Sequence, residues 1–235
     1  LGSIWQQESQ AMFERYAIYL TFDGALGARG AEWLGWNLAT GTECEQPILG
    51  DFDLAAITKR PRPYGFHATI KAPFRVTEEA SEDALLSRFE RYCATTKPVR
   101  TEGLEISQIG RFLALTLRSK DSAVRALAGE VVQTFDPFRA PLTQADIARR
   151  NPDRLPSAQR SNLMRWGYPH VMDAYKFHVT LTGPMNEPIL EIVRGAAGNF
   201  FAPVLPVPFG IAHLTLAGQK GDGMFYEISR APLKG

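Results

Sequence analysis

Apolar residues recur along this chain in two kinds of pattern, one typical of strands and one typical of helices. Short runs rich in β-branched and aromatic residues predict strands at residues 15–22, 104–109, 111–118, 207–216 and 224–229. Apolar residues at helical spacing predict helices at residues 54–59, 81–95, 121–135 and 186–200, and in the stretch that reaches about residue 37. The two kinds alternate without a low-complexity linker, which predicts an α+β fold.

A ten-residue pattern occurs twice, at residues 64–73 (YGFHATIKAP) and 175–184 (YKFHVTLTGP). Side chains alternate between the two faces of a strand, so the first copy places His67, Thr69 and Lys71 on one face. The second copy does the same with His178, Thr180 and Thr182. Each copy therefore reads as a strand with one apolar face and one polar face, and the polar face needs water or a ligand in front of it.

The stretch between the two copies, residues 137–169, differs in composition because it is rich in arginine. Thr143 begins a capping-box pattern, and Ser157 is a candidate cap for a second short helix that ends at Gly167. We interpret this stretch as a helical insert. Its arginines are expected to lie mostly on a solvated face.

The repeat predicts two similar lobes that face one another across a cleft. Residues 1–235 are expected to form a single bilobal domain. The first copy would lie within residues 15–135 and the second within residues 170–235, with the arginine-rich insert between them.

Composition narrows the possible functions. The hydrophobic and charged fractions, 45% and 22%, are ordinary for a globular protein. A formal net charge of +1 provides no global field for a nucleic-acid backbone or an anionic membrane. No apolar run approaches the roughly 20 residues of a membrane span, and no signal peptide is visible. Cys44 and Cys93 lack metal-type spacing, so a reducing, cytoplasmic setting is expected.

Two histidines and two threonines in this arrangement suit one kind of chemistry. Imidazole titrates near neutrality, so one neutral histidine can accept a proton while one protonated histidine donates a proton to a leaving oxygen. Threonine hydroxyls can donate hydrogen bonds to phosphoryl oxygens, and Lys71 would add a cation where charge builds up. The set favours in-line cleavage of a phosphodiester without a metal. Which histidine is the acid and which the base is left open.

The paired H-h-T-h motifs (h is apolar), His67–Ile70 and His178–Leu181, resemble the signatures of the two-histidine (2H) phosphoesterase superfamily. Their surroundings resemble one bacterial branch, known as domain of unknown function 1045 and often labelled a phosphonate-metabolism protein. The resemblance rests on the strings RYAIY, YGFHATIKAPF, FRAPLT and RWGYP, at residues 15–19, 64–74, 138–143 and 165–169.

This resemblance implies a bilobal α+β fold with antiparallel sheets flanked by helices around a central cleft. It also implies catalysis by His67, Thr69, His178 and Thr180, with no metal or other cofactor. The implied substrate is a small phosphodiester, with a ribosyl cyclic phosphate from carbon–phosphorus bond breakdown as the natural candidate. Relatives in the superfamily act on cyclic nucleotides or RNA ends, so an RNA 2′,3′-cyclic phosphate is an alternative substrate.

Five further residues are candidates for contact with the substrate. Lys71 is favoured as a phosphate contact. The two tyrosines of the repeat could either pack at the strand entrance or line the cleft, and the last two residues belong to the branch-like strings. The five are Lys71, Tyr64, Tyr175, Arg139 and Tyr168.

Other interpretations of the histidines remain. A third H-h-T-h string begins at His213, but its flanks lack the Tyr, Phe and Pro of the two copies, so an ordinary strand histidine is expected there. His170 follows Pro169 in a loop-like stretch and is expected to have a surface or supporting role.

Two alternatives to the phosphodiesterase are compatible with these residues. The first is a metallohydrolase that uses His67, His178 and His213, although no clustered metal-ligand signature appears in the sequence. The second is a protein that binds a phosphorylated ligand without turnover. Retained histidines argue against it, because Lys, Arg and backbone amides suffice to bind phosphate.

Overall fold

The computed structural model describes residues 13–120 and 122–235. The N-terminal segment in which no signal peptide was recognised, and the expected start of a helix at Asp121, therefore lie outside the described residues. In the described part of the chain, no helix is both long and apolar enough to cross a membrane.

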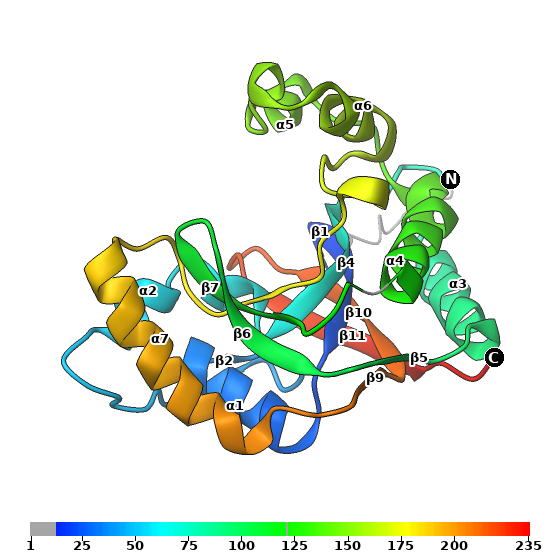
Figure 1. Cartoon of the computed structure of the whole chain (residues 1–235). Helices are drawn as coiled ribbons and strands as arrows, with labels where there is room; N and C mark the ends of the chain where they lie inside the picture. The colour runs from blue at the N-terminus through cyan, green and yellow to red at the C-terminus, as the bar shows by residue number, and fades with distance from the viewer. Residues whose placement is uncertain (1–12, 121) are drawn as a thin grey trace, which may run out of the picture.

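Seven strands form one antiparallel sheet in the order β11-β10-β1-β4-β8-β7-β6 (Figure 1). Two short ribbons, β2-β3 and β5-β9, accompany it. The strands are β1 (Arg15–Thr21), β2 (Trp36–Asn37), β3 (Thr42–Glu43), β4 (His67–Phe74), β5 (Val99–Thr101), β6 (Leu104–Ile109), β7 (Phe112–Leu117), β8 (Val179–Thr180), β9 (Phe209–Ile211), β10 (His213–Gln219) and β11 (Phe225–Pro232).

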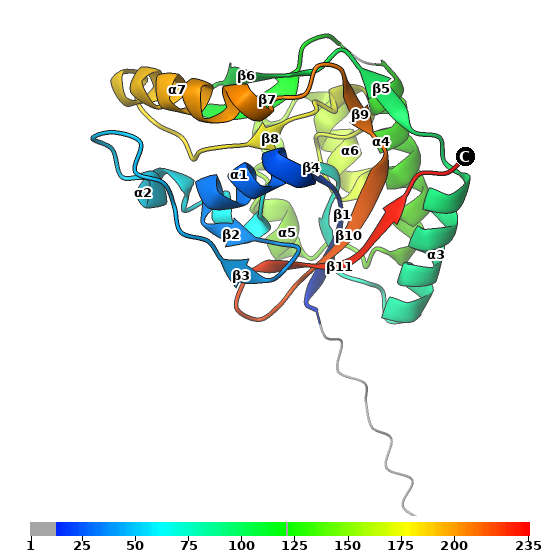
Figure 2. The same ribbon diagram turned by 90° about the horizontal axis from the view of Figure 1, so that it is seen from below.

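Helices cover the two ends of this sheet in separate pairs, visible in Figures 1 and 2. Helices α3 and α4 pack on β4, β10 and β11, whereas α1 and α7 pack on each other and α7 also contacts β6 and β7. The helices are α1 (Gly24–Leu34), α2 (Leu54–Thr58), α3 (Glu82–Thr95), α4 (Ser122–Phe135), α5 (Gln144–Ala148), α6 (Ser157–Trp166) and α7 (Glu187–Phe201).

Both halves of the sequence contribute strands to both ends of the sheet. The late strands β10 and β11 lie beside β1, the first strand, and the early strands β7 and β6 lie beside β8. The two groups, β11-β10-β1-β4 and β8-β7-β6, join where Ala68 of β4 pairs with Val179 of β8. The expected α+β fold with antiparallel strands and flanking helices is confirmed.

One buried apolar cluster runs beneath the junction of the two groups. It includes Ile18, Ala68, Leu115 and Val179, whose side chains are fully buried. Burial of this kind contributes roughly 25 cal/mol per Å² of apolar surface removed from water, so this face of the sheet is fixed against the helices. The opposite face of β4 and β8 is left for the polar side chains of the repeat.

The helix ends follow the expected chemistry in most cases. Ser81 Oγ accepts a hydrogen bond from the Ala84 amide, and Asn186 Oδ1 accepts one from Ile189. The capping box of Thr143 and Asp146 is present. Ser157, expected to be a cap, is instead the first helical residue, after Pro156.

The late strands differ from the prediction. Residues 207–216 were expected to form one strand, but they contain β9 and the start of β10, with Ala212 between them. The break allows β9 to pair with β5 and β10 to pair with β1. An apolar run does not reveal such a change of partner, because both pieces have the same pattern.

The arginine-rich stretch forms α5 and α6, which stand over one end of β1 and β4 in Figure 1. Arg75, just after β4, forms an ion pair of 2.5 Å with Asp146 of α5. An isolated bridge joins Val76 to Arg139 at the base of the insert. The insert is therefore tied to the end of β4, the first motif strand.

Trp33 of α1 donates a hydrogen bond of 2.8 Å from Nε1 to the carbonyl of Leu181, next to the second motif. Both groups are buried, so Trp33→Phe leaves the carbonyl without its donor. We expect a loss of about 1–3 kcal/mol in the free energy of unfolding, measured by urea denaturation. An unchanged denaturation midpoint would contradict this role.

Candidate functional site

The two copies of the repeat lie side by side in antiparallel orientation. The second copy was expected to be a full strand, but it has strand structure only at β8 (Val179–Thr180), so His178 directly precedes the strand. Ala68 pairs with Val179 on the core face of the sheet. In this antiparallel register, the positions on either side of that pair set His67 beside Thr180 and Thr69 beside His178. These four side chains lie on the opposite face of the sheet. The four residues expected to form the core site are therefore brought together as two cross-strand pairs of one histidine and one threonine.

His67 is held in one orientation from three sides. Its ring stacks on Tyr19 of β1 with 3.7 Å between ring centroids. Nδ1 lies 2.9 Å from the Gly65 carbonyl, and Nε2 lies 3.0 Å from Thr69 Oγ1. The carbonyl can only accept, so Nδ1 carries the proton and Nε2 accepts from the threonine hydroxyl in the neutral ring.

Burial lowers the pKa of His67 to about 4, opposed in part by the hydrogen bond to Gly65 and assisted by the nearby His178. Desolvation disfavours the charged form of the imidazole. His67 is therefore neutral at pH 7, with the Nε2 lone pair directed at Thr69.

His178 repeats this local geometry in more open surroundings. Its Nδ1 lies 2.9 Å from the carbonyl of Lys176, two residues earlier, as in the first copy. Phe112 is the aromatic neighbour, at 6.2 Å between centroids and tilted rather than stacked. The same tautomer is thus selected in both copies, while only His67 has a stacked ring beneath it.

Lys71 does not share the face of His67 and Thr69, contrary to expectation. The pairing of β1 with β4 shifts register between Tyr19, which faces Thr69, and Ile18, which faces Lys71. The extra residue in β4 is a β-bulge, and it breaks the alternation of faces. Lys71 is consequently buried, with Nζ 3.3 Å from the Val132 carbonyl of α4.

The ammonium of Lys71 also lies 3.7 Å from Asp136. Burial lowers the pKa of Lys71 to about 8, and Asp136 limits that shift. At the matching place in the second copy, Thr182 is buried and accepts a hydrogen bond of 3.1 Å from the Leu113 amide. The side chains of Lys71 and Thr182 therefore both bond to other residues of the protein.

Some of the other expected contact residues bond to other parts of the protein, and some lie beside a cavity. The Tyr175 hydroxyl donates to the Thr69 carbonyl at 3.1 Å, which links the two copies. Arg139 donates to Asp136 and to the Arg165 carbonyl, at the base of the insert. Tyr64 lies 6.3 Å from His67 between ring centroids.

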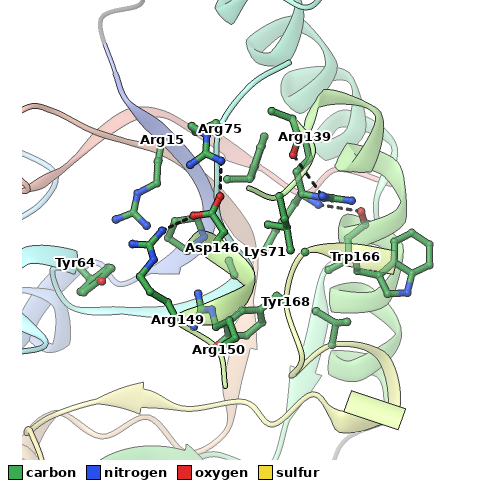
Figure 3. A pocket seen from close by; sticks show the side chains of 18 residues that line it. Arg15, Tyr64, Lys71, Arg75, Arg139, Asp146, Arg149, Arg150, Trp166 and Tyr168 are labelled. Atoms are coloured by element: carbon green, nitrogen blue, oxygen red, sulfur yellow. Dashed lines mark hydrogen bonds and ion pairs between the residues drawn. The ribbon is translucent and has the colours of Figure 1, made fainter. Parts of the chain in front are cut away.

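A cavity of about 380 Å³ lies between the end of β4 and the insert (Figure 3). Lys71, Tyr64, Arg139 and Tyr168 line it, as do residues that were not singled out from the sequence. Those additional residues include Arg15, Arg75, Asp146, Arg149 and Arg150. Tyr64 lines the cavity and is also a ring neighbour of His67, so it lies where the cavity approaches the histidine–threonine pairs.

The remaining histidines lie at the margin of the site or away from it. His213 Nε2 is 3.0 Å from the Thr21 carbonyl and contacts Arg230. His170 is exposed and packs edge-on against Tyr168 at 5.6 Å. Among the described residues, no three His, Cys, Asp or Glu side chains are grouped so that they could hold a metal ion.

Tyr19 and Arg15 were missed as site residues although both lie in a predicted strand. They are four residues apart, so they share a face of β1. That face becomes part of the site because β1 pairs with β4, which a single sequence does not reveal.

A family model described as "Protein of unknown function (DUF1045)" matches residues 69–226. Two curated proteins, both called ribose 1,5-bisphosphate phosphokinase PhnN, are also similar. The one from Janthinobacterium sp. (strain Marseille) is 35% identical over 97% of this chain, and the one from Laribacter hongkongensis (strain HLHK9) is 32% identical over 81%. The chain spans about half the length of each, 52% and 46%.

The structure of E. coli LigT complexed with 3′-AMP is similar in fold. It has a TM-score of 0.50 and 14% identity, and the match covers 95% of this chain and 99% of LigT. The expected fold is therefore confirmed as LigT-like.

The depressed pKa of His67 predicts a specific dependence of stability on pH. The unfolded chain takes up the proton near pH 6.5, whereas the folded chain does so near pH 4. Stability from this residue is therefore present above pH 6.5 and is lost as pH falls toward 4. Between pH 7 and pH 5, wild type should lose about 2 kcal/mol more than His67→Phe, which keeps a ring on Tyr19 but cannot titrate.

Urea denaturation at the two pH values measures this difference. Equal losses in the two proteins would show that His67 titrates normally.

Proposed function

Because the chain belongs to the DUF1045 family and has a LigT-like fold, we propose that it is a metal-independent phosphodiesterase for a small cyclic phosphodiester. The observation that carries this proposal is the pairing of β4 with β8. Its register pairs one histidine with one threonine from the other copy at each of two positions, on the face of the sheet opposite Ala68 and Val179. Two imidazoles with separate environments can then act on the same phosphorus atom.

We assign His67 as the general base and His178 as the general acid. His67 is neutral at pH 7 because burial lowers its pKa to about 4, and its Nε2 carries the lone pair that accepts from Thr69 in the absence of substrate. Nε2 would take a proton from the attacking water while the water oxygen bonds to phosphorus. The P–O bond to the leaving oxygen breaks, and His178 Nε2 donates a proton to that oxygen.

Thr69 and Thr180 would hold the non-bridging phosphoryl oxygens. The Thr69 hydroxyl, which lies 3.0 Å from His67 Nε2, can rotate to donate to a phosphoryl oxygen when substrate is present. Donors fixed before the reaction stabilise negative charge as it develops in the transition state. The Tyr175 hydroxyl bonded to the Thr69 carbonyl keeps this segment of β4 in place.

A ribosyl cyclic phosphate is the substrate that we favour. The similar proteins are called ribose 1,5-bisphosphate phosphokinase. Water opening a 1,2-cyclic phosphate of ribose 5-phosphate, with cleavage of the bond between phosphorus and O2, yields ribose 1,5-bisphosphate. The same pair of histidines would also suit an RNA 2′,3′-cyclic phosphate, which is the alternative substrate.

Tyr64 and Tyr168 are proposed to contact the substrate at the edge of the cavity. Lys71 and Arg139 are proposed to act on the substrate indirectly, because their charged groups already contact other residues of the protein. Both are paired with Asp136, so they would set the field and shape of the cavity wall while keeping their own contacts.

Replacing either histidine tests the acid–base assignment. His67→Ala or His178→Ala should lower kcat for a ribosyl 1,2-cyclic phosphate about 100- to 10,000-fold, while circular dichroism shows an intact fold. Product formation is followed by phosphorus NMR. His213→Ala is the matched control, because it removes the histidine of a third H-h-T-h string and should keep wild-type turnover.

Normal turnover in either of the first two variants would refute the assignment. Loss of wild-type activity in excess chelator, restored by a divalent metal, would favour the metallohydrolase. Tight binding without turnover, in wild type as in the variants, would favour a phospho-ligand binding protein.

The acid–base pair predicts a bell-shaped dependence of kcat/KM on pH. Activity should rise as pH increases through about 4, where the base His67 loses its proton, and fall again when the acid is deprotonated. A profile without an acidic limb between pH 3 and pH 6 would contradict the role of His67.

A further inference from the structure

The cavity beneath the insert is strongly basic, although the whole chain is nearly neutral. Asp146 is the one acidic side chain among its described lining residues. The basic lining residues are Arg15, Lys71, Arg75, Arg139, Arg149 and Arg150. A concave site with this excess of positive charge concentrates anions.

Carboxylates of the protein neutralise only some of these cations. Asp146 pairs with both Arg75 and Arg149, and these donors together with Thr143 hold its pKa well below the usual range. Asp136 pairs in the same way with Lys71 and Arg139.

Arg15 and Arg150 have no carboxylate partner in the described part of the chain. Arg15 donates from Nε to Gln219 at 2.6 Å, which leaves both terminal nitrogens of its guanidinium available. Arg150 lies over the ring of Tyr168 at 4.8 Å. Figure 3 shows both side chains, together with Arg149, around the same hollow.

A buried hydroxyl provides a second, independent indication of a ligand. Tyr19 is fully buried, and its Oη has no hydrogen-bond partner among the described residues. Burial raises the pKa of this hydroxyl well above its usual value, and the nearby Arg15, which lines the cavity, opposes that shift. An unpaired buried hydroxyl costs free energy, so a polar group bound here would remove that cost.

Tyr19 also connects the cavity to the histidine–threonine pairs. Its ring stacks directly on His67. Tyr64, which lines the cavity, is a second ring neighbour of His67, so a ligand in the cavity would lie close to His67.

We propose that the cavity binds a second, uncleaved phosphate group of the substrate through Arg15, Arg149, Arg150 and the Tyr19 hydroxyl. The inference rests on the proposed function, since the phosphodiester being cleaved lies at the two histidines. The substrate class is then a cyclic phosphodiester that also carries a phosphate monoester. Guanidinium groups bind phosphate oxygens in bidentate fashion, and a monoester dianion matches the excess of cations better than a neutral sugar does.

Two substrates that differ in one group test this inference. They are a ribosyl 1,2-cyclic phosphate with a 5-phosphate and the same compound without it. Wild type should show a kcat/KM at least about 100-fold higher for the phosphorylated compound, because several charge-assisted hydrogen bonds depend on that group.

Three variants should reduce this preference. Arg149→Gln and Arg150→Gln should each lower kcat/KM about 10- to 100-fold for the phosphorylated substrate only. Tyr19→Phe keeps the stacked ring and should lower the same ratio without loss of thermal stability. Arg160→Gln, in the same insert but outside the cavity and exposed, is the matched control and should behave as wild type.

The outcomes separate this inference from the proposed function. Equal turnover of the two compounds by wild type, or equal effects of Arg150→Gln on both, would overturn the second phosphate site and leave the phosphodiesterase standing.

If wild type cleaves neither compound, the assignment of a ribosyl cyclic phosphate as substrate fails, and binding of ribose 5-phosphate, measured by calorimetry, decides the site. Binding that Arg150→Gln weakens and Arg160→Gln does not would support the site. Absence of binding by wild type, or equal binding by both variants, would overturn it.

Discussion

The pairing of β4 with β8 is the contact on which the candidate site depends. Only Ala68 and Val179 form a paired position between these strands, yet this pair sets the position of all four motif side chains. The side chains of the pair lie in the core, fully buried. A slip of one residue would turn the motif of one strand toward the core. Apolar packing on one face therefore fixes the polar geometry on the other.

The two copies of the motif share their local geometry and differ in what surrounds them. Each histidine has Nδ1 at 2.9 Å from the carbonyl two residues earlier. Only His67 is stacked on a buried tyrosine, and only the first copy borders the basic cavity through Tyr64. The repeat thus supplies two histidines with the same local geometry, and the neighbouring strand β1 and the arginine-rich insert give them different surroundings. Because the surroundings of His67 and His178 differ, a bound substrate would have a preferred orientation between them.

Sequence patterns predicted the first motif strand and most helices, because those depend on local spacing. The second motif was expected to be a strand of similar length, but only Val179 and Thr180 form one. The patterns were also misleading at Lys71, where the bulge opposite Ile18 and Tyr19 moves the side chain to the other face. A bulge arises from the way two strands pair, so it cannot be recognised from the alternation of polar and apolar residues in one strand. The same limit applies to the insert. Arg150 and Arg160 look equivalent in sequence, but in the structure Arg150 lines the cavity and Arg160 does not.

The order of strands in the sheet has a consequence for how the molecule reaches its native state. Arg15 of β1 is bonded to Gln219 of β10, 204 residues later in the chain. Closing so long a loop precedes any gain from the contact, so folding of this topology is governed by slow, non-local pairing. Until β10 arrives, β1 has an open edge next to the strand that carries His67. The candidate site is therefore completed late in folding. A chain truncated before β10 would expose an unpaired strand edge beside the strand that carries His67, where it could pair with other chains.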